Sequence, residues 1–199
     1  VPVKKSALGG AVPGDKERFS LAYTAKGELT ARVETVYGSA DSARICADAI
    51  IDSAGIPHVF PAEVLAEAES LRERGISDRE RENREDLREW CIFTIDGRDA
   101  KDLDDAVSLE RKGDGWLLGV HIADVSHYVT AGSALDREAM KRGTSVYFAD
   151  RVIPMLPQVL SNGACSLHAG TDKLTLSALL YYDKKWNFKK SRLTKSVIC

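Results

Sequence analysis

The chain has 199 residues, and its hydrophobic content of 44% is enough to bury the core of one large domain or of two small ones. Its 28 Lys and Arg residues nearly balance its 30 Asp and Glu residues, so whole-chain charge does not mark it as a nucleic-acid binder. The four cysteines form no CxxC pair, which argues against a zinc site and against a dense disulfide framework.

No apolar run is long enough to span a membrane, and the first residues lack a signal-peptide pattern. Together with the cysteine usage, this favours a cytoplasmic protein in a reducing environment. The chain begins without an initiator methionine and ends in a strand-like run, so we expect both ends to be cut from a longer protein.

Residues 1–38 contain short strand-like runs separated by turn signals. Residues 13–15 (Pro-Gly-Asp) predict a turn between the first two strands, and Lys26-Gly27 predicts a hairpin turn between the second and the third. Three strands cannot close a barrel by themselves, so we expect part of a small β unit. For its aromatic residues we favour core packing over stacking on nucleic acid; they are Phe19, Tyr23 and Tyr37.

From Ser39 onward the apolar residues recur at helical spacing. This spacing predicts a helix that is capped by Asp41 and ends at Gly55. A second helix is predicted over 61–75, with proline at its first turn and glycine at its end. Residues 72–89 are rich in arginine and acidic residues and have few apolar positions, so we interpret them as an exposed, solvated connector.

The most specific stretch is TIDGRDAKDLDDAV at 94–107, which places five aspartates within ten positions between two strand-like runs. Crowded carboxylates raise one another's pKa unless a divalent cation neutralises them. The candidate ligands are all oxygen donors, which favours magnesium, manganese or calcium over zinc or copper. The sequence therefore predicts a metal site, and the alternative is an acidic loop in contact with solvent.

A calcium-binding EF-hand does not fit this stretch. Counted from Asp102, the fifth and sixth positions of such a loop are Ala106 and Val107, where an oxygen ligand and a glycine are needed. What remains is a magnesium-type carboxylate site, whose commonest chemistry is phosphoryl or phosphodiester transfer.

Three blocks of sequence carry a resemblance to a known family. They are TIDGRDAKDLDDAV, VHIADVSHYV at 120–129 and IPMLPQVLSNGACSL at 153–167. In order and approximate spacing they resemble the ribonuclease II/ribonuclease R (RNB) family of processive 3′-to-5′ exoribonucleases. The resemblance implies Mg²⁺-dependent hydrolysis of RNA to nucleoside 5′-monophosphates, with Mn²⁺ as an alternative ion and the 3′ end of single-stranded RNA as the partner.

The resemblance also implies the roles of individual aspartates. Asp104 corresponds to the catalytic residue that the family treats as indispensable, whereas Asp99 lies outside the ligand set and is expected to be solvated or to support it. The four residues implied as metal ligands, which we call the aspartate quartet, are Asp96, Asp102, Asp104 and Asp105.

For the fold, the resemblance implies a mixed α/β (α+β) chain in three parts. Residues 1–38 would be the C-terminal part of a cold-shock, OB-type RNA-binding domain with a partial β barrel, and residues 39–89 a helical connector. Residues 90–199 would be the truncated N-terminal part of an RNB catalytic domain, a mixed β-sheet with helices. We expect such a fragment to be inactive by itself. The competing hypothesis is a non-catalytic RNA-binding module in which the acidic loop has only a structural role.

The elements after the acidic loop are predicted from local patterns. A β-hairpin is predicted from 106–111 to 116–125, and His121 within it is expected to be a hydrogen-bonded core residue rather than a ligand. Ser133 is expected to cap a helix over 134–142.

A short aromatic strand is predicted over 144–148. By resemblance, Tyr147 in this strand is the candidate residue for stacking on the 3′-terminal base of the RNA. The alternative is that Tyr147 packs in the core, with its neighbour Phe148 as a competitor for the stacking role.

The last predicted hairpin joins 174–182 to 188–198. Six basic residues lie between Lys184 and Lys195, from the turn into the second strand, and they are interleaved with aromatic residues. This pattern fits a surface that follows phosphates, but lysines also protect edge strands from unwanted pairing, and we favour the latter interpretation.

Overall fold

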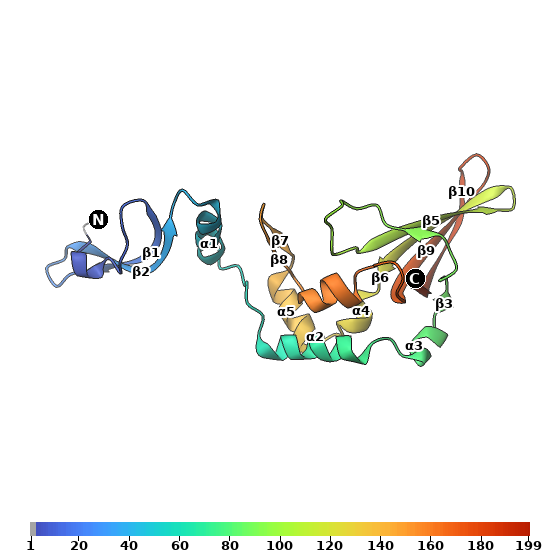
Figure 1. The fold of residues 1–199 in the computed structure, drawn as a ribbon, viewed down its shortest axis with the longest axis horizontal. Coiled ribbons are helices and arrows are strands. Elements are labelled where there is room, and N and C mark those ends of the chain that lie inside the picture. Colours follow the sequence, from blue (N-terminus) through green and yellow to red (C-terminus); the bar gives the residue numbers. More distant parts are fainter. Residues whose placement is uncertain (1–2) are drawn as a thin grey trace. The chain divides into compact units, whose positions relative to one another are not determined.

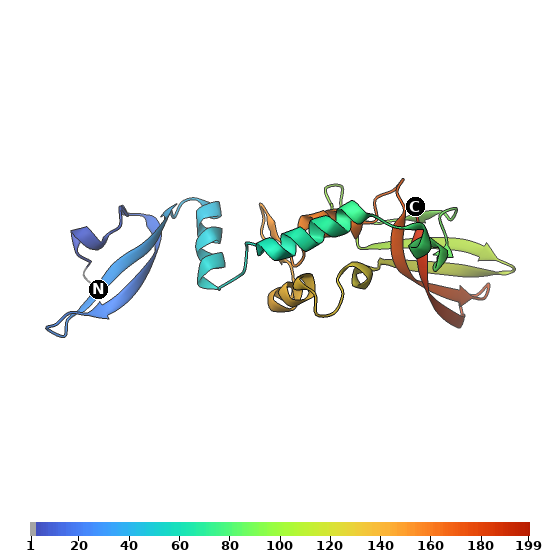
Figure 2. The same ribbon diagram turned by 90° about the horizontal axis from the view of Figure 1, so that it is seen from below.

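The computed structural model describes residues 3–199 and divides the chain into two compact units (Figures 1 and 2). The first unit comprises the chain up to Val59 together with Val146–Ile153. The second comprises Phe60–Ser145 and Pro154–Cys199. None of the helices in residues 3–199 is long and apolar enough to cross a membrane.

The first unit is built on a β-hairpin. Strand β1 (Asp15–Tyr23) pairs antiparallel with β2 (Leu29–Ser39), as the turn signal at Lys26-Gly27 predicts. The prediction of a further strand before Pro13 is wrong. This segment forms the short 3-10 helix η1 (Lys5–Ala7) and turns, because two successive glycines with positive φ follow the helix and turn the chain out of an extended conformation.

Helix α1 (Ala43–Ser53) begins one residue later than the sequence predicts. The capping residue is Ser42, whose Oγ accepts a hydrogen bond from the Ile45 N–H, and not Asp41. The small hairpin of β7 (Val146–Tyr147) and β8 (Val152–Ile153) belongs to the same unit. It is joined to α1 by Arg151, which forms a 2.8 Å ion pair with Asp48.

The second unit contains a six-stranded sheet in the order β3-β10-β9-β6-β5-β4. Strand β3 runs parallel to β10, and the other neighbours are antiparallel. Both predicted hairpins are confirmed, one formed by β5 and β6 and the other by β9 and β10. The strands are β3 (Glu85–Asp86), β4 (Ile92–Phe93), β5 (Asp105–Lys112), β6 (Gly115–Ala123), β9 (Lys173–Tyr182) and β10 (Phe188–Ile198).

Helices α2, α4 and α5 gather at one end of the sheet, whereas α3 lies next to β3 (Figure 1). Helix α2 packs against α5 and against a π-helical turn, through Val64 and Ala68 on α2 and Leu135 on α5, all fully buried. Ser133 caps α5 as predicted, accepting a hydrogen bond from the Asp136 N–H. The elements are α2 (Ala62–Arg74), α3 (Asp78–Glu82), α4 (Val125–Tyr128), α5 (Ala134–Arg142) and the π-helical turn η2 (Leu160–Ala164).

The interpretation of residues 72–89 as a solvated segment is wrong for two of its residues. Leu87 is buried in the core, and the Arg84 side chain is buried beside Asp124. One Arg84 nitrogen donates to an Asp124 carboxylate oxygen at 2.6 Å, and another donates to the Thr175 carbonyl. The guanidinium is retained inside because its charge is neutralised and its N–H groups have acceptors.

His121 is a hydrogen-bonded core residue, as predicted. It is fully buried, and its ring nitrogens lie 3.0 Å from the Ser108 hydroxyl and 2.6 Å from the Ser177 hydroxyl. Burial lowers the pKa of His121 to about 4, so its ring is neutral at neutral pH. Gly119 makes room for it, because a Cβ there would lie only 2.6 Å from the imidazole.

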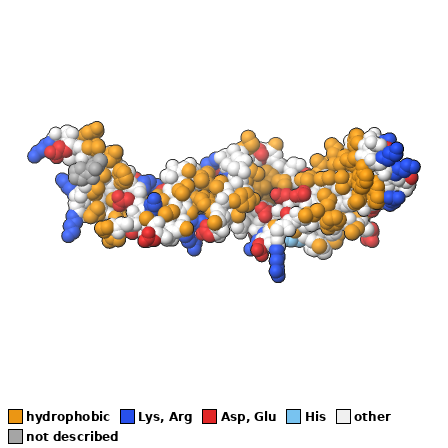
Figure 3. Space-filling model, turned by 90° about the horizontal axis from the view of Figure 1, so that it is seen from above, with side chains coloured by type: hydrophobic (Ala, Val, Ile, Leu, Met, Phe, Trp, Pro, Cys, Tyr) orange, Lys and Arg blue, Asp and Glu red, His pale blue; other side chains and the backbone are white. Residues whose placement is uncertain are grey.

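The basic residues of β10 lie on an edge of the sheet. Within the described residues, β3 pairs only with Ser196 and Val197, so the preceding part of β10 has β9 on one side alone. Lys and Arg side chains gather at the tip of the sheet, where both long hairpins turn (Figure 3). This position agrees with edge protection, and the phosphate-following alternative stays untested.

Candidate functional site

The acidic stretch forms the connection between β4 and β5. Strand β4 ends at Phe93, earlier than the predicted run, and the chain is irregular until Asp105 opens β5. The end of this loop is attached to β6, because the Ala123 N–H donates to the Asp104 carbonyl at 3.0 Å. The Leu103 side chain packs against the hydrophobic core, whereas its neighbour Asp104 is exposed and its neighbour Asp102 is partly exposed.

A buried serine holds the loop from the other side. Ser166 accepts a hydrogen bond from the Leu103 N–H at 2.9 Å and donates one to the Lys101 carbonyl at 2.8 Å. Sequence reasoning missed this residue, although it lies in the third block that resembles the family. Its position there was the only available signal, since nothing local to Ser166 indicates a contact 63 residues away.

The aspartate quartet is electrostatically coupled. Desolvation raises the pKa of Asp104, and the negative charges of its neighbours raise it further. The three carboxylates with this effect are Asp102, Asp105 and Asp96, which are the other members of the quartet. The ionised form of Asp104 is therefore disfavoured, and a nearby cation would stabilise it.

The donors fit a hard divalent cation in chemistry, although they do not form a closed cage. In residues 3–199, no three His, Cys, Asp or Glu side chains come together closely enough to hold a metal ion as they stand. The quartet offers only carboxylate oxygens, which suit Mg²⁺, an ion that usually keeps several waters and takes few protein ligands. Assignment of the quartet as metal ligands stays a prediction.

Tyr147 belongs to the first unit, where β7 pairs with β8. Its side chain is 66% exposed, which does not agree with the core-packing alternative. The competing Phe148 is less exposed, and the Arg151 guanidinium lies over its ring at 5.9 Å. Tyr147 therefore has the more accessible ring of the two, and its role in stacking stays a prediction.

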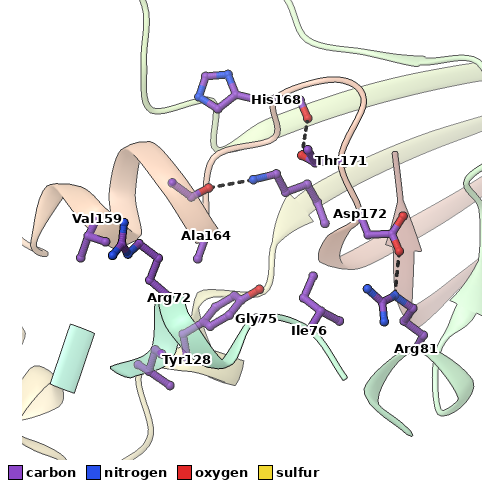
Figure 4. Close-up of a pocket in the computed structure, with 13 residues that line it drawn as sticks. Arg72, Gly75, Ile76, Arg81, Tyr128, Val159, Ala164, His168, Thr171 and Asp172 are labelled. Carbon is purple, nitrogen blue, oxygen red and sulfur yellow. Dashed lines mark hydrogen bonds and ion pairs between the residues drawn. The ribbon is translucent and has the colours of Figure 1, made fainter. Parts of the chain in front are cut away.

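A separate cavity of about 700 Å³ lies in the second unit between α2, α4, η2 and the segment before β9 (Figure 4). Two of its charged lining residues, Asp172 and Lys173, already have hydrogen-bond partners. Asp172 accepts a hydrogen bond from Arg81 at 2.7 Å, and Lys173 donates to the Gly163 carbonyl at 2.8 Å. Burial lowers the pKa of Lys173. The members of the aspartate quartet do not line this cavity.

The acidic loop, the sheet that carries it and the three sequence blocks define a class of protein. The RNB domain profile matches residues 84–199, more than half of the chain, and the chain therefore belongs to the RNB-domain family. The match begins at Arg84, and the predicted domain start at residue 90 stays a prediction.

Ribonucleases R are among the relatives of this chain. The chain is 46% identical over 196 residues to ribonuclease R of Thermotoga maritima, covering 96% of this chain and 28% of that protein. It is 44% identical over 154 residues to ribonuclease R of Escherichia coli, covering 77% of this chain and 19% of that protein. The chain thus spans less than a third of these relatives.

Solved structures agree on the fold. RNase R of Mycoplasma genitalium, in complex with double-stranded RNA, superposes with a TM-score of 0.85 at 28% identity, over 99% of this chain and 35% of that one. Yeast Ssd1, a pseudonuclease, superposes with a TM-score of 0.72 at 18% identity and shows the fold alone. The predicted family and the predicted mixed α/β fold are confirmed.

Proposed function

We propose that the protein containing this chain is a Mg²⁺-dependent exoribonuclease that hydrolyses RNA from its 3′ end to nucleoside 5′-monophosphates. Family membership supports the reaction class. The observation that carries the proposal is the coupled quartet, because Asp102, Asp105 and Asp96 all raise the pKa of Asp104. Carboxylates held in repulsion next to a strand end are a suitable place for a divalent cation.

In this proposal each group has a distinct task. The quartet holds the cation, with Asp104 as the residue on which cleavage depends. When bound, the cation stabilises the negative charge that develops on the phosphoryl oxygens. The exposed ring of Tyr147 stacks on the 3′-terminal base of the RNA. Stacking tolerates any base, which suits an enzyme that degrades RNA regardless of sequence.

The second candidate function is a non-catalytic RNA-binding protein. One observation favours considering it, since a yeast pseudonuclease shares this fold. The fold by itself therefore does not determine whether the protein is catalytic. That depends on whether the acidic side chains hold a cation.

The test is an assay of the full-length protein on single-stranded RNA, with one sample labelled at its 5′ end and another labelled uniformly. Mg²⁺, Mn²⁺ and a chelator are compared, and the released nucleotides are identified by chromatography. Release of nucleoside 5′-monophosphates that requires the divalent cation supports the proposal. RNA binding without any release would favour the non-catalytic alternative.

A further inference from the structure

The backbone around the quartet is held by hydrogen bonds at successive peptide groups. The Ser166 hydroxyl bonds to the Lys101 carbonyl and to the Leu103 N–H, which belong to the two peptide groups that flank Asp102. These bonds fix both sides of one quartet residue from a single side chain.

The next two peptide groups are held as well. The Leu167 N–H donates to the Leu103 carbonyl at 2.8 Å, and the Ala123 N–H donates to the Asp104 carbonyl at 3.0 Å. The two peptide groups that flank Asp104 are therefore also anchored. Of these contacts, only those of Ser166 are made by a side chain, so a substitution can remove them without altering the main chain.

Serine is well suited to this position because its hydroxyl can accept one hydrogen bond and donate another at the same time. Alanine can do neither. Ser166 is fully buried, so water cannot readily replace the lost contacts, and the freed Lys101 and Leu103 groups would reorganise the loop. The repulsion within the quartet favours such a reorganisation, because it separates like charges.

We propose that Ser166 is a positioning residue for the metal centre, since its hydroxyl sets the backbone on both sides of Asp102 and thereby directs that carboxylate toward the site shared with Asp104. This inference rests on the proposed function. Groups that orient metal ligands typically change metal affinity by about 10- to 100-fold when they are removed.

The test uses the full-length protein and measures Mn²⁺ binding by electron paramagnetic resonance, without RNA. Ser166→Ala is expected to weaken Mn²⁺ binding by about 10-fold or more. The Mg²⁺ concentration needed for half-maximal RNA hydrolysis should rise in parallel, while hydrolysis at saturating Mg²⁺ recovers in part. Ser166→Thr keeps the hydroxyl and is expected to retain Mn²⁺ affinity close to that of the wild type.

Ser177→Ala is the matched control. Ser177 is equally buried and also bonds two groups, His121 and Ser196, but it lies away from the acidic loop. The Ser177→Ala substitution should lower the melting temperature without changing the affinity for Mn²⁺. If Ser166→Ala does not fold, Ser166→Cys takes its place, because sulfur is only a weak donor and acceptor.

Wild-type Mn²⁺ affinity and wild-type Mg²⁺ dependence in a folded Ser166→Ala or Ser166→Cys protein would overturn the inference. A wild-type protein that binds Mn²⁺ but releases no nucleotide would instead contradict the proposed function. The two failures are distinguishable because the binding measurement does not depend on catalysis.

Discussion

Arg84 and Asp124 form an ion pair inside the second unit, with a 2.6 Å contact and only 4% of each side chain exposed. Burial opposes ionisation of Asp124, but its hydrogen bonds to Arg84 and Ser126 and the charges of Arg84 and Lys195 lower its pKa on balance. The pair joins the segment before β3 to the end of β6, and the Arg84 contacts with the carbonyls of Thr175 and Ser196 tie in β9 and β10.

Removing one member of this pair should be costly. Asp124→Asn leaves the Arg84 charge buried without a counter-charge, and we expect it to lower the free energy of unfolding by about 3–5 kcal/mol. Tryptophan fluorescence during urea unfolding measures this, since Trp90, Trp116 and Trp186 all lie in the second unit. The control Asp78→Asn removes a 95% exposed carboxylate beside Arg81 and should change little. Equal effects of the two substitutions would contradict the assignment of the Arg84 pair as structural.

Asp104→Asn in the full-length protein should abolish RNA hydrolysis, with a loss of at least about 100-fold in rate, because the charge that the cation needs is removed. Affinity for RNA should be largely retained, since it comes mainly from phosphate and stacking contacts. Single-turnover cleavage and filter binding measure the two quantities. Asp99→Asn, outside the quartet, is the matched control and should stay near wild-type activity. Turnover of Asp104→Asn within a few-fold of wild type would rule out its assigned role.

Tyr147→Ala should change where degradation stops more than how fast it begins. Loss of one stacked base costs about 1–3 kcal/mol, which matters most when few nucleotides remain bound. A denaturing gel of the limit products reports this as longer final fragments. Tyr147→Phe keeps the ring and should give the wild-type ladder. An unchanged ladder for Tyr147→Ala would remove Tyr147 from the binding site.

His121 should make the second unit less stable in acid. Its folded-state pKa of about 4 lies below the unfolded value near 6.5, so the unfolded chain binds the additional proton. The stabilisation is fully present above pH 6.5 and falls by about 1.4 kcal/mol per pH unit as the pH decreases toward 4. Urea unfolding of the wild type and of His121→Gln at several pH values isolates this contribution. Parallel stability curves for the two proteins would show that His121 does not titrate on unfolding.

The 199-residue chain by itself should not hydrolyse RNA, although it carries the quartet. Stabilising a phosphodiester transition state needs positively charged side chains as well as a cation, and the chain spans only 28% of the ribonuclease R of Thermotoga maritima. The purified chain is incubated with single-stranded RNA and Mg²⁺, and its Asp104→Asn version controls for contaminating nuclease. Mononucleotides released by the wild-type chain but not by the variant would show that no further segment is required.

The local sequence determined much of what the structure shows. Glycine at position 75 and serine at position 133 mark helix ends because capping depends on residues only a few positions apart. The long hairpins follow from alternation and turn residues, which also act over short distances. The aspartate quartet was identifiable because its members lie within ten positions of one another, and the three motif blocks indicated the family.

Only the tertiary structure decided which charged and polar residues are buried. Arg84 lies in a charged segment whose composition predicts exposure to solvent. It is buried only because Asp124, 40 residues later in the chain, lies opposite it. Ser166 reaches the acidic loop across 63 residues. Desolvation and pairing energies depend on which segments meet in space, and a local pattern contains no information about a group's distant neighbours. The same reason applies to Asp104, because the desolvation that contributes most to its raised pKa depends on the folded chain, whereas the crowding of its neighbours is visible in the sequence.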